Sequence, residues 1–152
     1  MTVPPIPEST AAPSLGPLEL TVQRILWRST APLTAREVMA ALDSPTAGPP
    51  AYTTVATVLE HLWEKGMAQR ARIGRSWSYE PRMTGCQFSA LQMAQALEQT
   101  PDELRCLSRF VEALTPQNRE RLAGLLDGSI PAPQPHDRTR LADLAEAGST
   151  AR

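Results

Sequence analysis

The sequence lacks most features that mark secreted or membrane-bound proteins. Two cysteines are too few for a disulfide framework. No apolar run approaches the roughly 20 residues that a membrane span requires. The proline-rich first residues have neither the basic region nor the apolar core of a signal peptide. The sequence therefore predicts a cytoplasmic protein with no membrane segment.

Signatures of catalysis and of metal binding are missing as well. There is no phosphate-binding glycine loop, no plausible Ser/His/Asp or Cys/His set, and no concentrated acid pair at helical spacing in a candidate cleft. Cys86 and Cys106 stand twenty residues apart and do not form a zinc-site spacing with His61 and His136. We therefore expect no enzyme activity, no metal and no cofactor. The cysteines are interpreted as small buried groups near a subunit interface.

Lysine is nearly absent, since fourteen of the fifteen basic residues are arginine. The formal net charge is −1, so the whole chain gives no hint of a nucleic-acid partner. Residues 15–82 carry eight basic and six acidic residues, whereas residues 83–152 carry seven basic and nine acidic ones. This asymmetry weakly favours a DNA-binding module in the first half, where arginine suits bidentate contacts to phosphate.

Composition and apolar spacing divide the chain into four parts. A disordered arm (1–14), a compact module (15–82), a helical region (83–128) and a flexible tail (129–152) are predicted. The compact module is expected to hold three helices, at about 15–29, 34–42 and 52–65, followed by a hairpin within 67–80. Two or three short amphipathic helices are expected after it. The fold class is therefore mostly α with a small β-hairpin.

Local sequence signals predict several helix ends. Thr34 and Glu37 match a capping box at the start of the second helix, and Gly66 suits a left-handed cap at the end of the third. A second capping box is expected at Thr100 to Glu103, with Pro101 at the first helical position. A further helix is expected to open at Thr115-Pro116.

The helix expected at 52–65 is the most informative segment. Val55, Val58, Leu59 and Leu62 fall on one face, and the opposite face, near the helix start, carries small and hydroxyl-bearing groups at Tyr52, Thr53, Ala56 and Thr57. Threonine can hydrogen-bond a base edge, and its methyl can pack against that of thymine. The alternative is an ordinary solvated face, but threonine is a poor helix former and gives such a face no stability.

Four other polar residues of this module allow two interpretations each. Arg72 and Arg75 of the hairpin either contact phosphate or are simply solvated, and Arg36 either contacts phosphate or joins a surface ion pair. Thr54 either caps its helix or touches phosphate. Arg70 is expected to be an ordinary surface residue. Trp63 and Trp77 are expected in core and wing packing.

The order of these elements resembles the penicillinase-repressor (BlaI, MecI and CopY) family of winged-helix transcriptional regulators. The resemblance covers about residues 15–81, and beyond residue 82 only the helical pattern agrees. The matching segments are 15–19, 25–27, 34–38, 52–55, 57–59, 62–66, 74–75 and 79–81. Many relatives have lysine and glutamine on the recognition helix where this chain has Thr53 and Ala56, so its operator is expected to differ.

The resemblance implies a winged helix-turn-helix repressor that binds a pseudo-palindromic operator as a homodimer. Helix 52–65 is then the recognition helix in the major groove, and 67–80 is the wing on the phosphate backbone. The expected DNA-binding residues are Arg36, Tyr52, Thr53, Thr54, Thr57, Arg72 and Arg75. The helices of 83–128 are expected to dimerise through Phe88, Leu91, Leu104, Leu107, Phe110, Val111, Leu122 and Leu125.

The inducing signal stays open. Copper-responsive members carry closely spaced C-terminal cysteine pairs, which this chain lacks. β-Lactam-responsive members are cleaved by a partner membrane protease ahead of a phenylalanine. Phe110 stands at the corresponding place, but Arg109 precedes it where asparagine is expected. Two other classes also remain, a winged-helix module that binds proteins instead of DNA and a ligand-sensing regulator.

Overall fold

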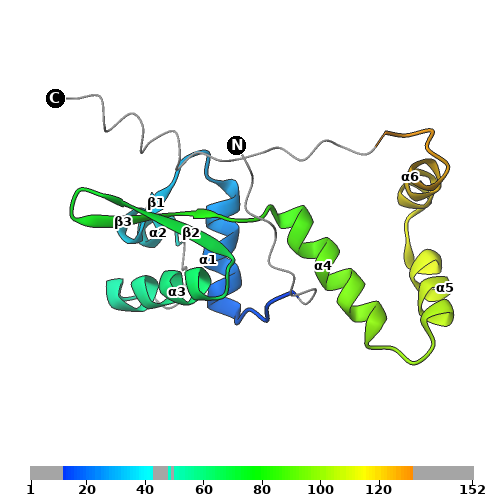
Figure 1. Ribbon diagram of the computed structural model, residues 1–152, viewed down its shortest axis with the longest axis horizontal. Helices are drawn as coiled ribbons and strands as arrows, with labels where there is room; N and C mark the ends of the chain where they lie inside the picture. The colour runs from blue at the N-terminus through cyan, green and yellow to red at the C-terminus, as the bar shows by residue number, and fades with distance from the viewer. Residues whose placement is uncertain (1–11, 43–47, 49, 132–152) are drawn as a thin grey trace.

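The computed structural model describes residues 12–42, 48 and 50–131. It contains the expected three helices and hairpin followed by three more helices (Figure 1). The elements are α1 (Pro17–Arg28), β1 (Leu33–Thr34), α2 (Ala35–Ala41), α3 (Tyr52–Glu64), β2 (Ala68–Ile73), β3 (Ser76–Pro81), α4 (Gly85–Glu98), α5 (Glu103–Ala113) and α6 (Pro116–Leu126). The fold is a mostly α winged helix, as the sequence predicted.

The sheet has three antiparallel strands in the order β1-β3-β2. The hairpin of β2 and β3 was expected, but β1 was missed because two residues are too few for a periodicity signal. Leu33 of β1 pairs with Tyr79, which makes β3 the central strand and buries Ser78, Tyr79 and Glu80. The sheet thereby holds the wing to the three-helix unit.

The core lies where α1, α2, α3 and the sheet meet. Three helices contribute fully buried aliphatic side chains to it, and Met67, directly before β2, is also fully buried in it. The central members, all 1% exposed or less, are Val22, Leu26, Val38, Val55, Leu59, Leu62 and Met67. Burying each such side chain contributes about 1.5 to 3 kcal/mol. This core fixes which face of α3 remains outside.

Several predicted helix ends are confirmed. Thr34 Oγ1 accepts from Glu37 N at 3.4 Å, and Thr34 N donates to a Glu37 carboxylate oxygen at 2.7 Å. Gly66 has a φ of 71°, the left-handed conformation that glycine adopts without strain. Thr115 caps α6 with Pro116 at its first position.

The capping box predicted at residues 100–103 is wrong. Asp102 is the N-cap of α5, since its Oδ1 accepts from Arg105 N at 3.0 Å. The helix therefore begins at Glu103, and Pro101 lies outside it. A carboxylate directly before the helix is a strong acceptor for first-turn amides, so it sets the start two residues later than expected.

Two boundaries also differ from the expectation. Residues 12–14 were assigned to the arm, yet Ala12 is buried and Ser14 O accepts from Lys65 Nζ at 2.9 Å. Ile130 was assigned to the tail, yet its N–H donates to Gly124 O at 2.9 Å. Residues 1–11 and 132–152, which make up most of the predicted arm and tail, lie outside the described residues, as does His136.

The last three helices leave this unit. In Figure 1, α4 leads away from the sheet, and α5 and α6 lie beyond the end of α4 that is distant from the sheet. In the part of the chain that the structure describes, none of the helices combines the length and the apolar character needed to cross a bilayer.

Candidate nucleic-acid interface

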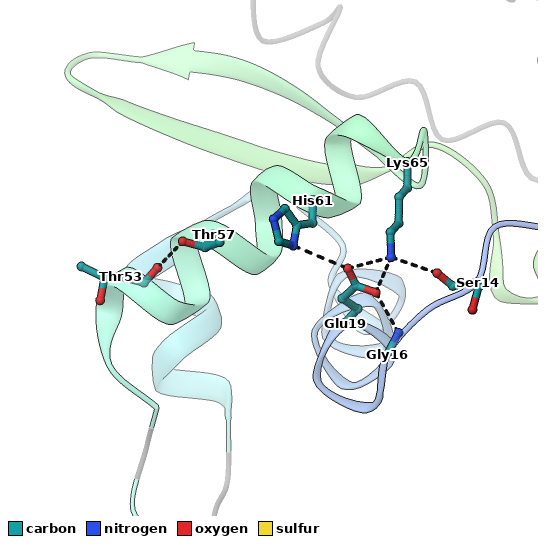
Figure 2. Close-up of polar contacts among 7 residues, drawn as sticks. All are labelled: Ser14, Gly16, Glu19, Thr53, Thr57, His61 and Lys65. Atoms are coloured by element: carbon teal, nitrogen blue, oxygen red, sulfur yellow. Dashed lines mark hydrogen bonds and ion pairs between the residues drawn. The ribbon is translucent and has the colours of Figure 1, made fainter.

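Helix α3 presents its predicted outer face to solvent. Val55, Leu59 and Leu62 are 0% exposed, whereas Tyr52 is 50% exposed and Thr53 and Thr57 are also exposed. Figure 2 shows Thr53 and Thr57 next to each other along the start of the helix. Ala56 is partly covered by the core, so it contributes less to this face than the sequence suggested.

The two threonines are linked by a hydrogen bond along the helix. Thr57 Oγ1 donates to Thr53 O at 2.9 Å (Figure 2). Because the hydroxyl proton is used inside the helix, the oxygen lone pairs and the methyl group are what Thr57 offers outward. That combination suits an adenine or cytosine amino group, or a thymine methyl.

The start of α3 has no side-chain cap. Its N-cap residue is Ala51, whereas Thr34, Thr84, Asp102 and Thr115 cap α2, α4, α5 and α6 with side-chain oxygens. Thr54 lies exposed inside the first turn, two positions after the first helical residue, and no side chain caps this helix start, so the capping role considered for Thr54 is not seen. Its N–H donates to Ala51 O at 3.0 Å. Because Thr54 N and Val55 N both donate to Ala51 O, the first-turn amides open to an external acceptor such as phosphate are those of Tyr52 and Thr53.

The wing carries its arginines outward. Gly74, with a φ of 62°, makes the turn between β2 and β3, and Arg75 follows it. Arg72 and Arg75 are both exposed, and Arg72 pairs with Trp77 across the strands. Arg36 is exposed in the first turn of α2.

Arg70 is not the ordinary surface residue that the sequence suggested. Its guanidinium carbon lies 3.7 Å from the ring centroid of Trp63 and 4.4 Å from that of Trp77. Its Nη1 also lies 3.7 Å from a carboxylate oxygen of Glu60. Trp63, expected in the core, is 41% exposed and forms one side of this stack. An arginine between two tryptophans joins the end of α3 to both strands of the wing.

A second set of contacts holds α3 against α1. Lys65 Nζ lies 2.7 Å from Glu19 Oε2 and 2.9 Å from Glu19 Oε1 (Figure 2). Gly16 N donates to the same carboxylate at 2.7 Å, and His61 Nδ1 lies 3.8 Å from it. The hydrogen bond from Lys65, opposed in part by burial, lowers the pKa of Glu19 below 4.5. The sequence placed His61 at the edge of the apolar face but did not pair it with Glu19.

The residues expected to dimerise fall into two groups. Phe88 is 3% exposed and belongs to the core of its own chain, and Leu91 packs against that core. Five side chains of α5 and α6 expose apolar surface instead, namely Leu104 (79%), Leu107 (44%), Phe110 (43%), Val111 (37%) and Leu125 (44%). Leu122 is half-buried. Phe88 is thus covered by its own chain, whereas the five side chains of α5 and α6 are not.

The cysteines do not match the burial expected of them. Cys86 is exposed and Cys106 is half-buried in the single chain. Within the described residues no group of three or more His, Cys, Asp or Glu side chains is arranged to hold a metal ion.

Comparisons with known proteins find sequence similarity over most of the chain. The sequence model of the penicillinase repressor family matches residues 15–128. The transcriptional regulator BlaI of Mycobacterium tuberculosis, in strains CDC 1551 / Oshkosh and H37Rv, is 38% identical over 101 residues, covering 64% of this chain and 72% of that protein.

Two solved structures are more distant. The monomeric form of Bacillus licheniformis BlaI, in complex with the blaP half-operator, has a TM-score of 0.40 and 24% identity, covering 49% of this chain and 87% of that one. A probable transcriptional regulator from Pseudomonas aeruginosa has a TM-score of 0.39 and 22% identity, covering 77% and 80% of the two chains.

Proposed function

The chain belongs to the penicillinase repressor family of DNA-binding transcriptional repressors, and we propose that it binds a pseudo-palindromic operator as a homodimer. Family membership makes it a regulator rather than an enzyme. It favours operator binding over the protein-interaction and ligand-sensing alternatives. Because its proposed target is operator DNA, we propose that the protein acts in the cytoplasm.

Helix α3 is proposed to enter the major groove by its first two turns. The observation that carries this proposal is the exposed hydroxyl face at a helix start whose N-cap residue, Ala51, provides no side-chain cap. The start of α1 also lacks an N-cap side-chain oxygen, but there the Glu19 carboxylate accepts from Gly16 N. The positive end of the helix dipole and the first-turn amides attract phosphate there. The other half of the outer face carries Glu60 and Glu64, whose negative charge disfavours deeper insertion.

Specificity and affinity are then divided between two sets of side chains. Tyr52, Thr53 and Thr57 contact bases or the groove edge, while Thr54 and Arg36 lie beside the phosphates. Arg72 and Arg75 on the exposed wing neutralise phosphate charge and release counterions, so binding weakens as salt increases.

The dimer is proposed to form through α5 and α6. Monomers rarely expose contiguous apolar patches of large side chains, and Leu104, Leu107 and Phe110 expose such surface here. A two-fold dimer presents its two α3 helices to successive major grooves, about 34 Å apart. Occupancy of the operator then blocks transcription.

Relief of repression by a membrane protease stays part of the proposal. The bond between Arg109 and Phe110 lies inside α5, where Arg109 Nη1 donates to Glu112 Oε2 at 2.9 Å. A helical peptide bond does not fit an extended protease cleft, so cleavage there requires α5 to unwind first. Arg109 stands before Phe110 at the position where the cleaved relatives are expected to have asparagine.

Selection of binding sites from random duplex DNA tests the proposal directly. Purified protein is expected to recover a motif with two-fold symmetry and a fixed half-site separation. Light scattering on the same protein is expected to give the mass of two chains. Recovery of no motif, or of an unsymmetrical one by a single chain, would contradict operator binding by a dimer.

A further inference from the structure

Trp27 at the end of α1 contacts the start of α4. Its Nε1 donates to Met83 O at 2.9 Å, across 56 positions of sequence. Its ring centroid lies 5.7 Å from that of Phe88, with the planes tilted by 45°. Phe88 lies in the first turn of α4, just after the residues that connect the helix to β3.

Gly85 brings the backbone close to the same indole. A methyl group at Gly85 would lie 3.3 Å from Trp27 Cε3 and 3.4 Å from Cδ2, which is tighter than an ordinary contact. Thr84, immediately before, caps the helix and accepts from Gln87 N at 3.2 Å. The helix therefore begins at the point where its backbone rests on the tryptophan ring.

The rest of α4 makes few packing contacts with the winged helix. After Leu91 its side chains are half-buried or exposed, and the helix leads away from the sheet (Figure 1). Its direction relative to α3 is thus determined by its first two turns, from Gly85 to Leu91. We define Trp27, Met83, Gly85 and Phe88 as the joint between the winged helix and the helical arm.

We propose that this joint determines the spacing between operator half-sites that the dimer accepts. The inference rests on the proposed dimeric function, because it concerns the distance between two α3 helices connected through their arms. Helix α4 has 14 residues and is about 21 Å long at about 1.5 Å per residue. A tilt of roughly 10° at the joint moves the far end by about 3.6 Å, close to the 3.4 Å rise of one base pair.

A purely structural role for Trp27 predicts something different. Loss of core packing weakens binding to a half-site and to a full operator in the same proportion. A change in the direction of α4 leaves the half-site unaffected, because a single winged helix contacts it. It alters only the choice among full operators of different spacing. Half-site affinity and spacing preference therefore separate the two roles.

The experiment uses the full chain and the motif that it selects from random DNA. Operators are made with the two half-sites at the selected spacing and with one or two base pairs added or removed. Affinity for each is compared with affinity for one half-site, for the wild type, Gly85→Ala and Trp27→Phe. Gln92→Ala, an exposed substitution on the same helix, is the matched control. Gly85→Ala presses on the ring, whereas Trp27→Phe removes the donor to Met83 O.

We expect the wild type and Gln92→Ala to prefer one spacing by about tenfold over its neighbours. Gly85→Ala and Trp27→Phe are expected to keep half-site affinity within about twofold and to reduce that preference at least about threefold, or to move it by one base pair. Wild-type spacing preference in both variants overturns the inference, and so does an equal loss on half-sites and full operators.

The wild-type measurements in the same experiment test the proposed function itself, which is operator binding by a dimer. If wild-type protein has no spacing preference or stays a single chain, dimeric operator binding itself is wrong. If Gly85→Ala alone loses half-site binding through misfolding, Trp27→Phe, which keeps a ring against Phe88, decides the outcome.

Discussion

The ammonium group of Lys65 lies 2.7 Å from a carboxylate oxygen of Glu19, which joins the end of α3 to the first turn of α1. The Glu19 side chain is 12% exposed, and its carboxylate also accepts from Gly16 N. Because α1 belongs to the core, this contact fixes the far end of the helix whose opposite end is proposed to enter DNA.

The contact predicts that stability depends on pH. The hydrogen bond from Lys65 lowers the pKa of Glu19 in the folded state below its ordinary 4.5. The stabilisation is therefore complete above about pH 4.5 and is lost as pH falls through the lower folded pKa. Near neutral pH, Glu19→Gln is expected to reduce the free energy of unfolding by about 1 kcal/mol, allowing for the partly exposed lysine.

Urea denaturation of wild type and Glu19→Gln between pH 7 and pH 3 measures this dependence. The difference in the free energy of unfolding between the two proteins should become smaller as the pH falls. Glu64→Gln, on the exposed face of α3, is the control and should not reproduce the effect. A gap of constant size down to pH 3 would rule out the assigned ion pair.

Arg70 and Arg75 are expected to act in different ways on the same wing. Arg70→Gln removes the group between Trp63 and Trp77 and should lower the free energy of unfolding by about 1 kcal/mol. It should leave the salt dependence of DNA binding unchanged. Arg75→Gln should leave stability unchanged and reduce the slope of log affinity against log salt by about 0.9 per lost phosphate contact.

Chemical denaturation and DNA titrations at four salt concentrations measure both quantities. Arg70→Lys separates the two roles, because lysine keeps the positive charge but cannot stack on the tryptophan rings as a flat cation. If Arg70→Lys has wild-type stability and slope while Arg70→Gln loses slope, Arg70 contacts phosphate and its assigned role in the stack is wrong.

Thr57 is expected to contribute sequence preference through its methyl group. Its hydroxyl proton is held by Thr53 O, so Thr57→Val should keep most of the preference for operator over random DNA. Thr57→Ser should lose about 1 kcal/mol of that preference. Competition titrations with the selected operator and random duplex measure the ratio.

Thr21→Val is the matched control, since Thr21 Oγ1 makes the same type of bond to Pro17 O at 2.9 Å on α1. It should leave the ratio unchanged. The reverse order at position 57, with serine retaining preference and valine losing it, would assign the readout to the hydroxyl instead.

Phe110 is expected to be part of the dimer interface. Phe110→Asp places a charge on the exposed apolar face of α5 and should raise the dimer dissociation constant by at least about a hundredfold, since burying an unpaired charge costs several kcal/mol. Sedimentation equilibrium measures the constant. Ile73→Asp, at a wing residue that is 51% exposed, should leave it unchanged. A wild-type constant for Phe110→Asp would remove α5 from the interface.

The sequence by itself determined the helices, the β2–β3 hairpin and the outward face of α3, but not strand β1. Val55, Leu59 and Leu62 repeat at helical spacing, and Thr34 with Glu37 marks a helix start, because these signals arise between residues at most a few positions apart. They sufficed for the fold class and for the hydroxyl face that carries the proposed site.

Contacts between distant segments were decided only by the tertiary structure. Lys65 meets Glu19 across 46 positions, and Trp27 meets Met83 across 56. Arg70 lies between two tryptophans, and Phe88 joins the core instead of a partner. No local pattern encodes such pairs, since each depends on how α1, α3, the wing and α4 pack in three dimensions. The direction of the helical arm follows from that packing, and so does the separation of the two recognition helices in the proposed dimer.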